Sequence, residues 1–129
     1  MGASILFSIR KLLGGMSDDP AFETDLLIHI NALLSVLTQL GVGPEEGMSI
    51  ADGSTAWRDL LGDDPKWQIV PTWMYLRTKL VFDPPTISTV ADSMKKQADE
   101  YEWRISMLAD EEKSKEVRYA KRRIGPSRH

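Results

Sequence analysis

Cysteine is absent from the 129-residue sequence, and histidine occurs only at positions 29 and 129. The absence of cysteine excludes disulfide bonds, thiolate metal sites and cysteine nucleophiles, and it is typical of a reducing compartment. Two histidines also exclude a His-rich zinc site. Near the start, basic residues follow the first apolar residues instead of preceding them, and Leu6 stands where a myristoylation motif has Ser or Thr. We therefore expect neither export nor a lipid anchor.

Long apolar runs are missing as well. The uncharged run that precedes the first glycine of the loop at 41–47, residues 26–40, has 15 residues and includes polar side chains, whereas a bilayer requires roughly 20 mostly apolar residues. We therefore expect no transmembrane helix. With 42% apolar and 27% charged residues, the composition is typical of one soluble globular unit.

The net charge of −3 conceals an uneven distribution. Residues 113–129 hold seven basic side chains and one acid, Glu116, which gives +6, and residues 1–112 hold the other 9 basic and 18 acidic side chains, which gives −9. We therefore divide the chain into an acidic body, residues 1–112, and a basic C-terminal arm, residues 113–129.

Apolar residues at helical spacing predict two helices in the first third of the chain. The first spans residues 4–13 and ends at a glycine pair. The second opens at Asp19 and Pro20 and ends near Leu40, because Gly41 suits the left-handed position after a helix. Its apolar residues cover about half of its circumference, which predicts a central core helix. They are Phe22, Leu26, Leu27, Ile30, Leu33, Leu34, Val36, Leu37 and Leu40.

Two further helices are expected before residue 83. Ser54 is predicted to cap a short helix over residues 55–61, and residues 63–65, Asp-Asp-Pro, open the next one. In that helix Pro71 either produces a kink or marks the true first turn. The helix ends at Phe82 in the sequence FDPP, because each proline disfavours helical geometry in the preceding residue. Its core stripe is Ile69, Trp73, Leu76 and Leu80.

The last predicted helix begins between Thr86 and Ser88 and carries the clearest helical periodicity in the chain. Its core stripe is Ile87, Val90, Ala91, Met94, Ala98, Tyr101, Ile105 and Leu108. No segment alternates apolar and polar residues as a strand would. The predicted fold is therefore all-α, a small bundle of four to five helices with a long C-terminal helix and a basic tail extension.

No group of residues points to catalysis. His29 lies among apolar residues, where a lone histidine is a hydrogen-bonded core residue, and no nucleophile or acid accompanies it. The acid pairs 18–19, 45–46 and 63–64 fall in predicted turns, where they cap helices or face solvent. The glycine-rich loop 41–47 lacks the strand and the Lys-Ser/Thr of a phosphate loop. We expect no enzymatic activity, no metal site and no cofactor.

Trp103 points away from the core stripe of the last helix. On a helical wheel it lies about 180° from the centre of that stripe, with Met107 beside it. Lys96, Glu100 and Arg104 form an i, i+4 series of charges near it. Either another helix of the same chain covers Trp103, or a neighbouring subunit does, since Trp and Arg are enriched in interface hot spots. We name Trp103, Arg104 and Met107 as candidate subunit-interface residues.

The run from Tyr75 to Met107, YLRTKLVFDPPTISTVADSMKKQADEYEWRISM, resembles the head-tail connector (adaptor, or head-completion) family of long-tailed double-stranded DNA phages. FDPP at 82–85 and KQ followed by EWR at 102–104 carry the resemblance. HIN at 29–31, QLGVGPEEG at 39–47 and Trp57 agree with it, so that it covers about residues 4 to 109. Pro71 departs from the family pattern, in which that helix is uninterrupted.

The resemblance implies a structural virion protein of the neck, made in the host cytoplasm. Such proteins form a homo-oligomeric ring, expected to be a dodecamer, between the portal protein and the next neck or tail-completion protein. DNA passes through the ring without sequence specificity. The FDPP turn, Asp83, Pro84 and Pro85, is then architectural, and we predict that Asp83 caps the last helix.

The arm has no counterpart in the resemblance. The simplest interpretation of the arm is a solvated, partly disordered terminus. Tyr119 between basic residues, however, is an arrangement that binds nucleic acid or an acidic protein groove. We predict a portal-binding arm, poorly ordered alone, with DNA contact as the competing outcome. Its candidate residues are Arg118, Tyr119, Lys121, Arg122, Arg123 and Ile124.

Two alternatives remain open from the sequence. One is a free helical DNA-binding module, or protein-interaction module, whose tail neutralises phosphates; a body at −9 disfavours DNA wrapping. The other is an anti-repressor-like or chaperone-like adaptor that acts on host or scaffold proteins.

Overall fold

The computed structural model describes residues 2–14 and 19–124, with no account of the side chains of Arg123 and Ile124. Its elements are α1 (Ile5–Leu12), α2 (Pro20–Leu40), α3 (Trp57–Leu61), the 3-10 helix η1 (Pro65–Gln68), α4 (Ile69–Phe82) and α5 (Ser88–Ile124). Within these residues no strand is present, and only an isolated bridge joins Ser4 to Ala56. The predicted all-α class, with a long last helix, is confirmed.

The ends of α2 follow the predicted local chemistry. The carboxylate of Asp19 accepts a hydrogen bond from the backbone N–H of Ala21 at 2.9 Å, and Pro20 occupies the first turn. At the other end Gly41 adopts φ 94°, in the left-handed region, and closes the helix. Both bounds predicted for this helix are therefore confirmed.

The prediction that Ser54 caps the third helix is wrong. The helix begins at Trp57, because residues 55 and 56 are extended and pair with the segment before α1. The N–H of Ile5 donates to the carbonyl of Thr55 at 3.0 Å, and the N–H of Trp57 donates to the carbonyl of Ala3 at 2.9 Å. This contact between distant parts of the chain overrides the local preference for a serine cap.

Pro71 lies in the first turn of α4, directly after η1. The first four N–H groups of a helix have no acceptor within it, so a proline there removes no hydrogen bond. Of the two predicted alternatives, the first-turn position is the one observed. Asp64 caps η1, as expected, by accepting from the N–H of Lys66 at 3.1 Å.

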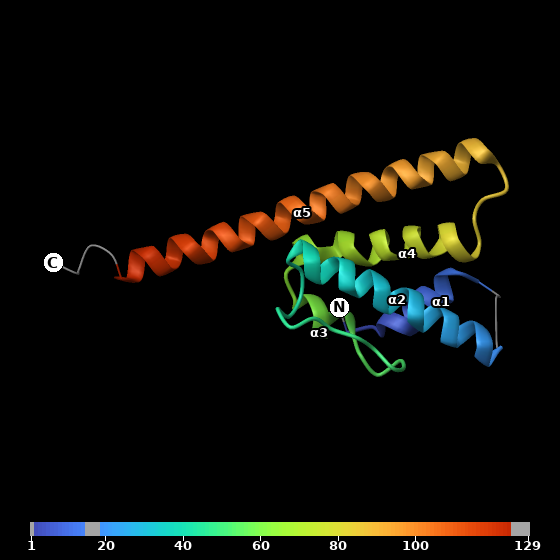
Figure 1. Cartoon of the computed structure of the whole chain (residues 1–129), viewed down its shortest axis with the longest axis horizontal. Helices are drawn as coiled ribbons and strands as arrows, with labels where there is room; N and C mark the ends of the chain where they lie inside the picture. Colours follow the sequence, from blue (N-terminus) through green and yellow to red (C-terminus); the bar gives the residue numbers. More distant parts are fainter. Residues whose placement is uncertain (1, 15–18, 125–129) are drawn as a thin grey trace.

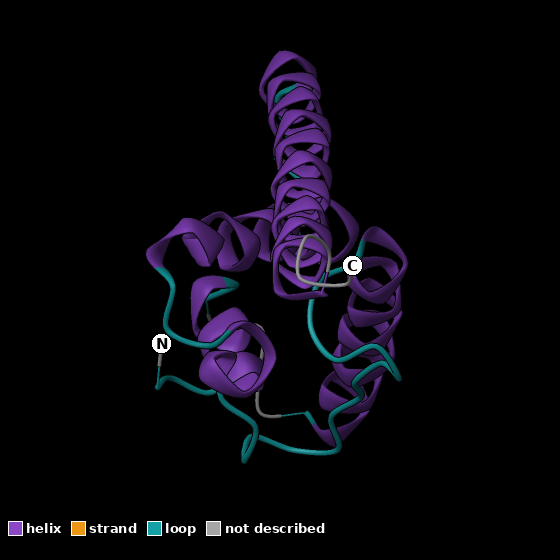
Figure 2. Ribbon diagram, turned by 90° about the vertical axis from the view of Figure 1, so that its left-hand side faces the viewer, coloured by secondary structure: helices purple, strands orange, loops and turns teal. Residues whose placement is uncertain are grey.

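Helix α4 is the centre of the bundle and packs against α1, α2 and α5. In Figure 1 it lies between α5 and the pair of α1 and α2, and Figure 2 shows α5 rising above the group that the other helices form. The predicted stripe of α4 is only partly correct, because Val70 and Met74 are fully buried beside Trp73 whereas Ile69 and Leu80 are half-buried. The fully buried large side chains of the core include Ile5, Ile9, Leu26, Ile30, Leu34, Leu37, Val70, Trp73, Met74 and Ile105.

Helix α2 is, by length and composition, able to cross a bilayer, which the 15-residue uncharged run did not predict. A core helix passes the same test, and five residues of α2 are buried in the common core: Leu26, Ile30, Leu33, Leu34 and Leu37. We therefore assign α2 to the core of the bundle.

Asn31 holds the long loop between α2 and α3 against the body. Its side-chain amide donates to the carbonyl of Ile50 at 3.0 Å, and its side-chain oxygen accepts from the N–H of Ile50 at 2.7 Å. Both backbone groups of Ile50 are thereby satisfied, and its side chain is buried in the core. The sequence pattern around Asn31 does not predict this role, because the partner Ile50 is distant in the chain.

The predicted core stripe of the last helix is correct in its middle and wrong at its beginning. Ala98 and Ile105 are buried, whereas Ile87 and Val90 are exposed. Periodicity defines a face of the helix but not how closely the neighbouring helix follows that face. Helices α4 and α5 diverge towards the FDPP turn, so the first turn of α5 lies away from α4 (Figure 1).

Candidate interaction surfaces on α5

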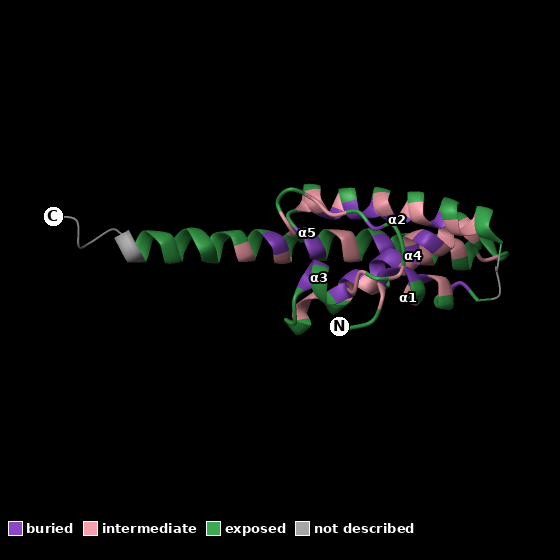
Figure 3. Cartoon of the chain, turned by 90° about the horizontal axis from the view of Figure 1, so that it is seen from below, coloured by how far each residue is buried: buried purple, intermediate pink, exposed green. Residues whose placement is uncertain are grey.

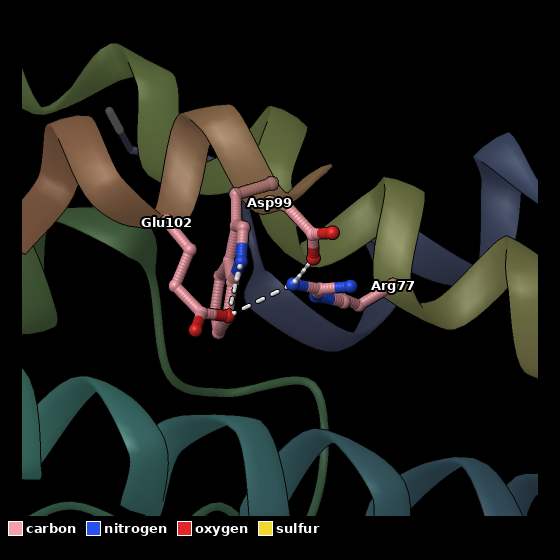
Figure 4. A network of polar contacts seen from close by, with 4 residues as sticks. Arg77, Asp99 and Glu102 are labelled. Atoms are coloured by element: carbon pink, nitrogen blue, oxygen red, sulfur yellow. Dashed lines mark hydrogen bonds and ion pairs between the residues drawn. The ribbon is translucent and has the colours of Figure 1, made fainter. Parts of the chain in front are cut away.

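A polar network fixes α5 to α4 (Figure 4). Arg77 of α4 forms ion pairs with Asp99 at 2.7 Å and with Glu102 at 3.1 Å. The indole N–H of the buried Trp73 donates to the same Glu102 carboxylate at 3.2 Å. Two side chains of α4 thus determine the position of α5 along it.

Trp103, the residue next to Glu102, points out of the body. Its side chain is 63% exposed, and that of Met107 is 44% exposed. The interpretation that another helix of the same chain covers Trp103 is therefore wrong for the described part of the chain. The alternative, a contact with a neighbouring subunit, stays a prediction, and an exposed indole with a methionine one turn further along suits such a contact.

Arg104 lies beside Trp103 and carries a positive charge that is only weakly paired. It forms the expected i, i+4 pair with Glu100 at 3.4 Å, and both side chains are more than half exposed. Exposed pairs of this kind contribute at most a few tenths of a kcal/mol. The guanidinium of Arg104 can therefore change partners at little cost.

Among the described residues, the side-chain partner of Asp83 lies in α4 and not at the start of α5. The carboxylate of Asp83 accepts from the ammonium of Lys79 at 3.1 Å, and the N–H of Asp83 donates to the carbonyl of Lys79 at 2.8 Å. Asp83 therefore closes α4, and the predicted capping of the last helix is wrong. Pro84 and Pro85 lie in the turn between the two helices, as the FDPP motif predicts.

The arm continues α5 without a break as far as the described residues extend. The last buried residue of α5 in the described part is Ala109, and Glu112 pairs with Lys66. Every side chain of residues 113–122 is exposed, and Figure 3 shows this part of α5 as a free helix. Lys115, Arg118, Tyr119 and Arg122 line one shallow surface on it. Residues 125–129 lie outside the described residues, and so do the side chains of Arg123 and Ile124.

His29 differs from its predicted environment. The Nε2 atom is buried without a hydrogen-bond partner among the described residues, and the ring packs edge-on against Phe82. Burial lowers the pKa of His29 below its usual value, because the charged form loses hydration. The expected hydrogen-bonded core histidine is therefore an aromatic packing residue instead.

The acids in turns behave as predicted. Asp63 pairs with Arg58 at 2.7 Å on the surface. The pKa of Asp64 is lowered, mainly by the hydrogen bond from the N–H of Lys66. Within the described residues, no group of three or more His, Cys, Asp or Glu side chains is arranged to hold a metal ion.

The family model of phage connector proteins matches residues 5–112 of the chain. Because this match covers most of the sequence, the chain belongs to the phage connector protein family. A search of curated proteins and a search of solved structures each found no match. The match ends at residue 112, and the described side chains of α5 beyond it, at residues 113–122, are all exposed.

Proposed function

We propose that this connector protein forms a ring in the neck of the virion, between the portal and the next neck or tail-completion protein, and that packaged DNA passes through the ring. The family match over residues 5–112 carries the proposal. A small helical body with exposed apolar side chains on α5 supports it, since a subunit of a ring must contact two neighbours.

The arm is proposed to bind the portal. From Ser88 to Ile124, α5 has 37 residues, a length of about 55 Å, and its final third lies clear of the body. This third carries Lys113, Lys115, Arg118, Lys121 and Arg122 against one acid. Such a helix suits an acidic groove, with the exposed Val117 and Tyr119 as apolar contacts.

The location and copy number are tested on intact particles. Cryo-electron microscopy of the neck should show a ring of this chain directly below the portal, a dodecamer if it follows the family. Particles in which the chain is absent, or lies outside the neck, would contradict the proposal.

The arm is tested by deleting every residue after Glu112. The truncated protein should keep the helicity of its body and lose binding to DNA-filled heads that bear a portal. As a matched control, Glu116→Lys in the full chain removes the only acid of the arm and should not weaken binding to an acidic surface. Normal binding by the truncated protein would remove the arm from the proposal.

DNA contact by the same basic residues is the competing outcome. Gel-shift titrations of the full chain with duplex DNA at several salt concentrations distinguish it, because phosphate contacts give a steep loss of affinity with salt. Salt-dependent DNA binding that disappears with the arm, together with unchanged portal binding, would assign the arm to DNA.

A further inference from the structure

The outer face of α2 is exposed yet carries no charge beyond Asp25. Ile28, Ala32, Ser35 and Gln39 succeed one another on it at intervals of three and four residues, all exposed, and Ile28 is 65% exposed. Figure 3 shows these outward turns of α2 as exposed. An exposed helix face normally bears charged side chains, whereas the centres of protein interfaces are depleted of them. This face of α2 therefore has the composition of a surface covered in the assembly.

A hollow of about 420 Å³ adjoins the C-terminal half of this face. Its wall is polar enough to accept a hydrogen bond from an indole N–H, which requires a partner when it is buried. Glu46 lies at the hollow, and within the described part of the chain no ion pair involves its carboxylate. The lining residues are Asn31, Ser35, Thr38, Gln39, Glu46, Gly47, Met48 and Ser49.

The outer face of α5 complements this region in shape and in charge. Trp103 and Met107 are large and project from the body, whereas the face of α2 has small side chains beside the hollow. Arg104 lies next to the indole, and within the described residues its positive charge is paired only with the exposed Glu100. Glu46 offers a negative charge at the hollow. One surface thus provides an apolar anchor with a cation, and the other a recess with an anion.

We propose that α5 of one copy docks on α2 of a second copy, with Trp103 in the hollow and Arg104 paired with Glu46. The two surfaces lie on different helices, so each copy offers one surface to one neighbour and the other surface to the next. Such a head-to-tail contact closes into a ring when its rotation permits. This inference rests on the proposed ring and identifies its subunit contact.

The absence of native cysteine permits a direct test by cross-linking. In particles assembled with the full-length double variant Ser35→Cys and Met107→Cys, a flexible bis-maleimide should give a ladder of dimers, trimers and higher products. The matched control combines Met107→Cys with Thr72→Cys, an exposed residue on α4, and should remain monomeric. A product that stops at the dimer, or no product from particles that contain the variant, would overturn the contact.

Charge exchange provides the second test. Trp103→Ala should lower incorporation of the chain into particles about tenfold or more, as expected for a central interface tryptophan. Arg104→Glu should lower incorporation several-fold, and adding Glu46→Arg should restore it. Failure of this rescue, with the unaltered chain present in particles, contradicts the inference alone. Absence of the unaltered chain from the neck contradicts the proposed function instead.

Discussion

The body and the arm share one continuous helix but are held by different forces. In the body, α5 buries Ala98, Ile105 and Ala109 against the core and is fixed to α4 by the Arg77 network. In the arm, every side chain that the structure describes, at residues 113–122, is exposed. Isolated helices of about 12 residues are marginal in water. The helical geometry of the arm is therefore continued from the body, and its sequence is free to serve a partner.

The largest expected effect concerns the core of the body. Trp73→Ala should lower the free energy of unfolding by about 3 to 5 kcal/mol, because Trp73 is fully buried and donates to Glu102. Urea unfolding followed by circular dichroism measures this change. Trp103→Ala is the matched control and should change the stability of the unassembled chain by less than about 0.5 kcal/mol. Equal losses from both tryptophans would contradict the distinction between core and interface.

The next effect concerns the attachment of α5 to α4. Arg77→Met should cost about 1 kcal/mol, because Glu102 and Asp99 lose their cation but remain partly exposed to water. The same substitution at Arg58, whose pair with Asp63 is fully on the surface, should have almost no effect. A loss at Arg77 no larger than that at Arg58 would mean that apolar packing alone positions α5.

A smaller effect is expected from pH. Because the pKa of His29 is lower in the folded state than in the unfolded state, protons bind preferentially to the unfolded chain. The contribution of His29 is fully present above its usual pKa of about 6.5 and decreases as the pH falls below it. Thermal melting over this range measures the decrease, and His29→Phe should reduce the pH dependence. An unchanged pH dependence in the variant would assign the effect to other groups.

At the FDPP turn, the capping role predicted for Asp83 and the contact observed in the structure imply different costs of removing its carboxylate. If Asp83 capped the last helix, Asp83→Ala would cost about 1 kcal/mol. Since its carboxylate instead pairs with Lys79 in an exposed i, i+4 contact, the expected cost is only a few tenths of a kcal/mol. Chemical denaturation of the variant distinguishes the two values.

Features determined by neighbouring residues were predictable from the sequence, and those determined by distant ones were not. Asp19 begins α2 through its side chain and Gly41 ends it through its backbone conformation, so the sequence predicts both bounds of the helix. Trp103 was placed on the outer face of α5 by helical periodicity alone. The start of α3 depends on pairing with residues 3–5, and the contacts of Asn31 depend on a loop about 20 residues away. The exposure of Ile87 depends on the divergence of α4 and α5 near the turn that joins them. The outer face of α2 was visible as an uncharged run but was interpreted only as core.

The smallest expected effect on stability comes from removing the arm itself. Deletion after Glu112 removes no buried side chain, because every described side chain beyond that residue is exposed. The free energy of unfolding should therefore change by less than about 0.5 kcal/mol, while the helical circular-dichroism signal decreases by the share of the arm. Glu112 is retained, so its ion pair with Lys66 persists. A loss of several kcal/mol in the free energy of unfolding would show that the basic residues stabilise the acidic body. Unchanged stability together with lost binding to heads would mean that the body and the arm differ in function as well as in structure.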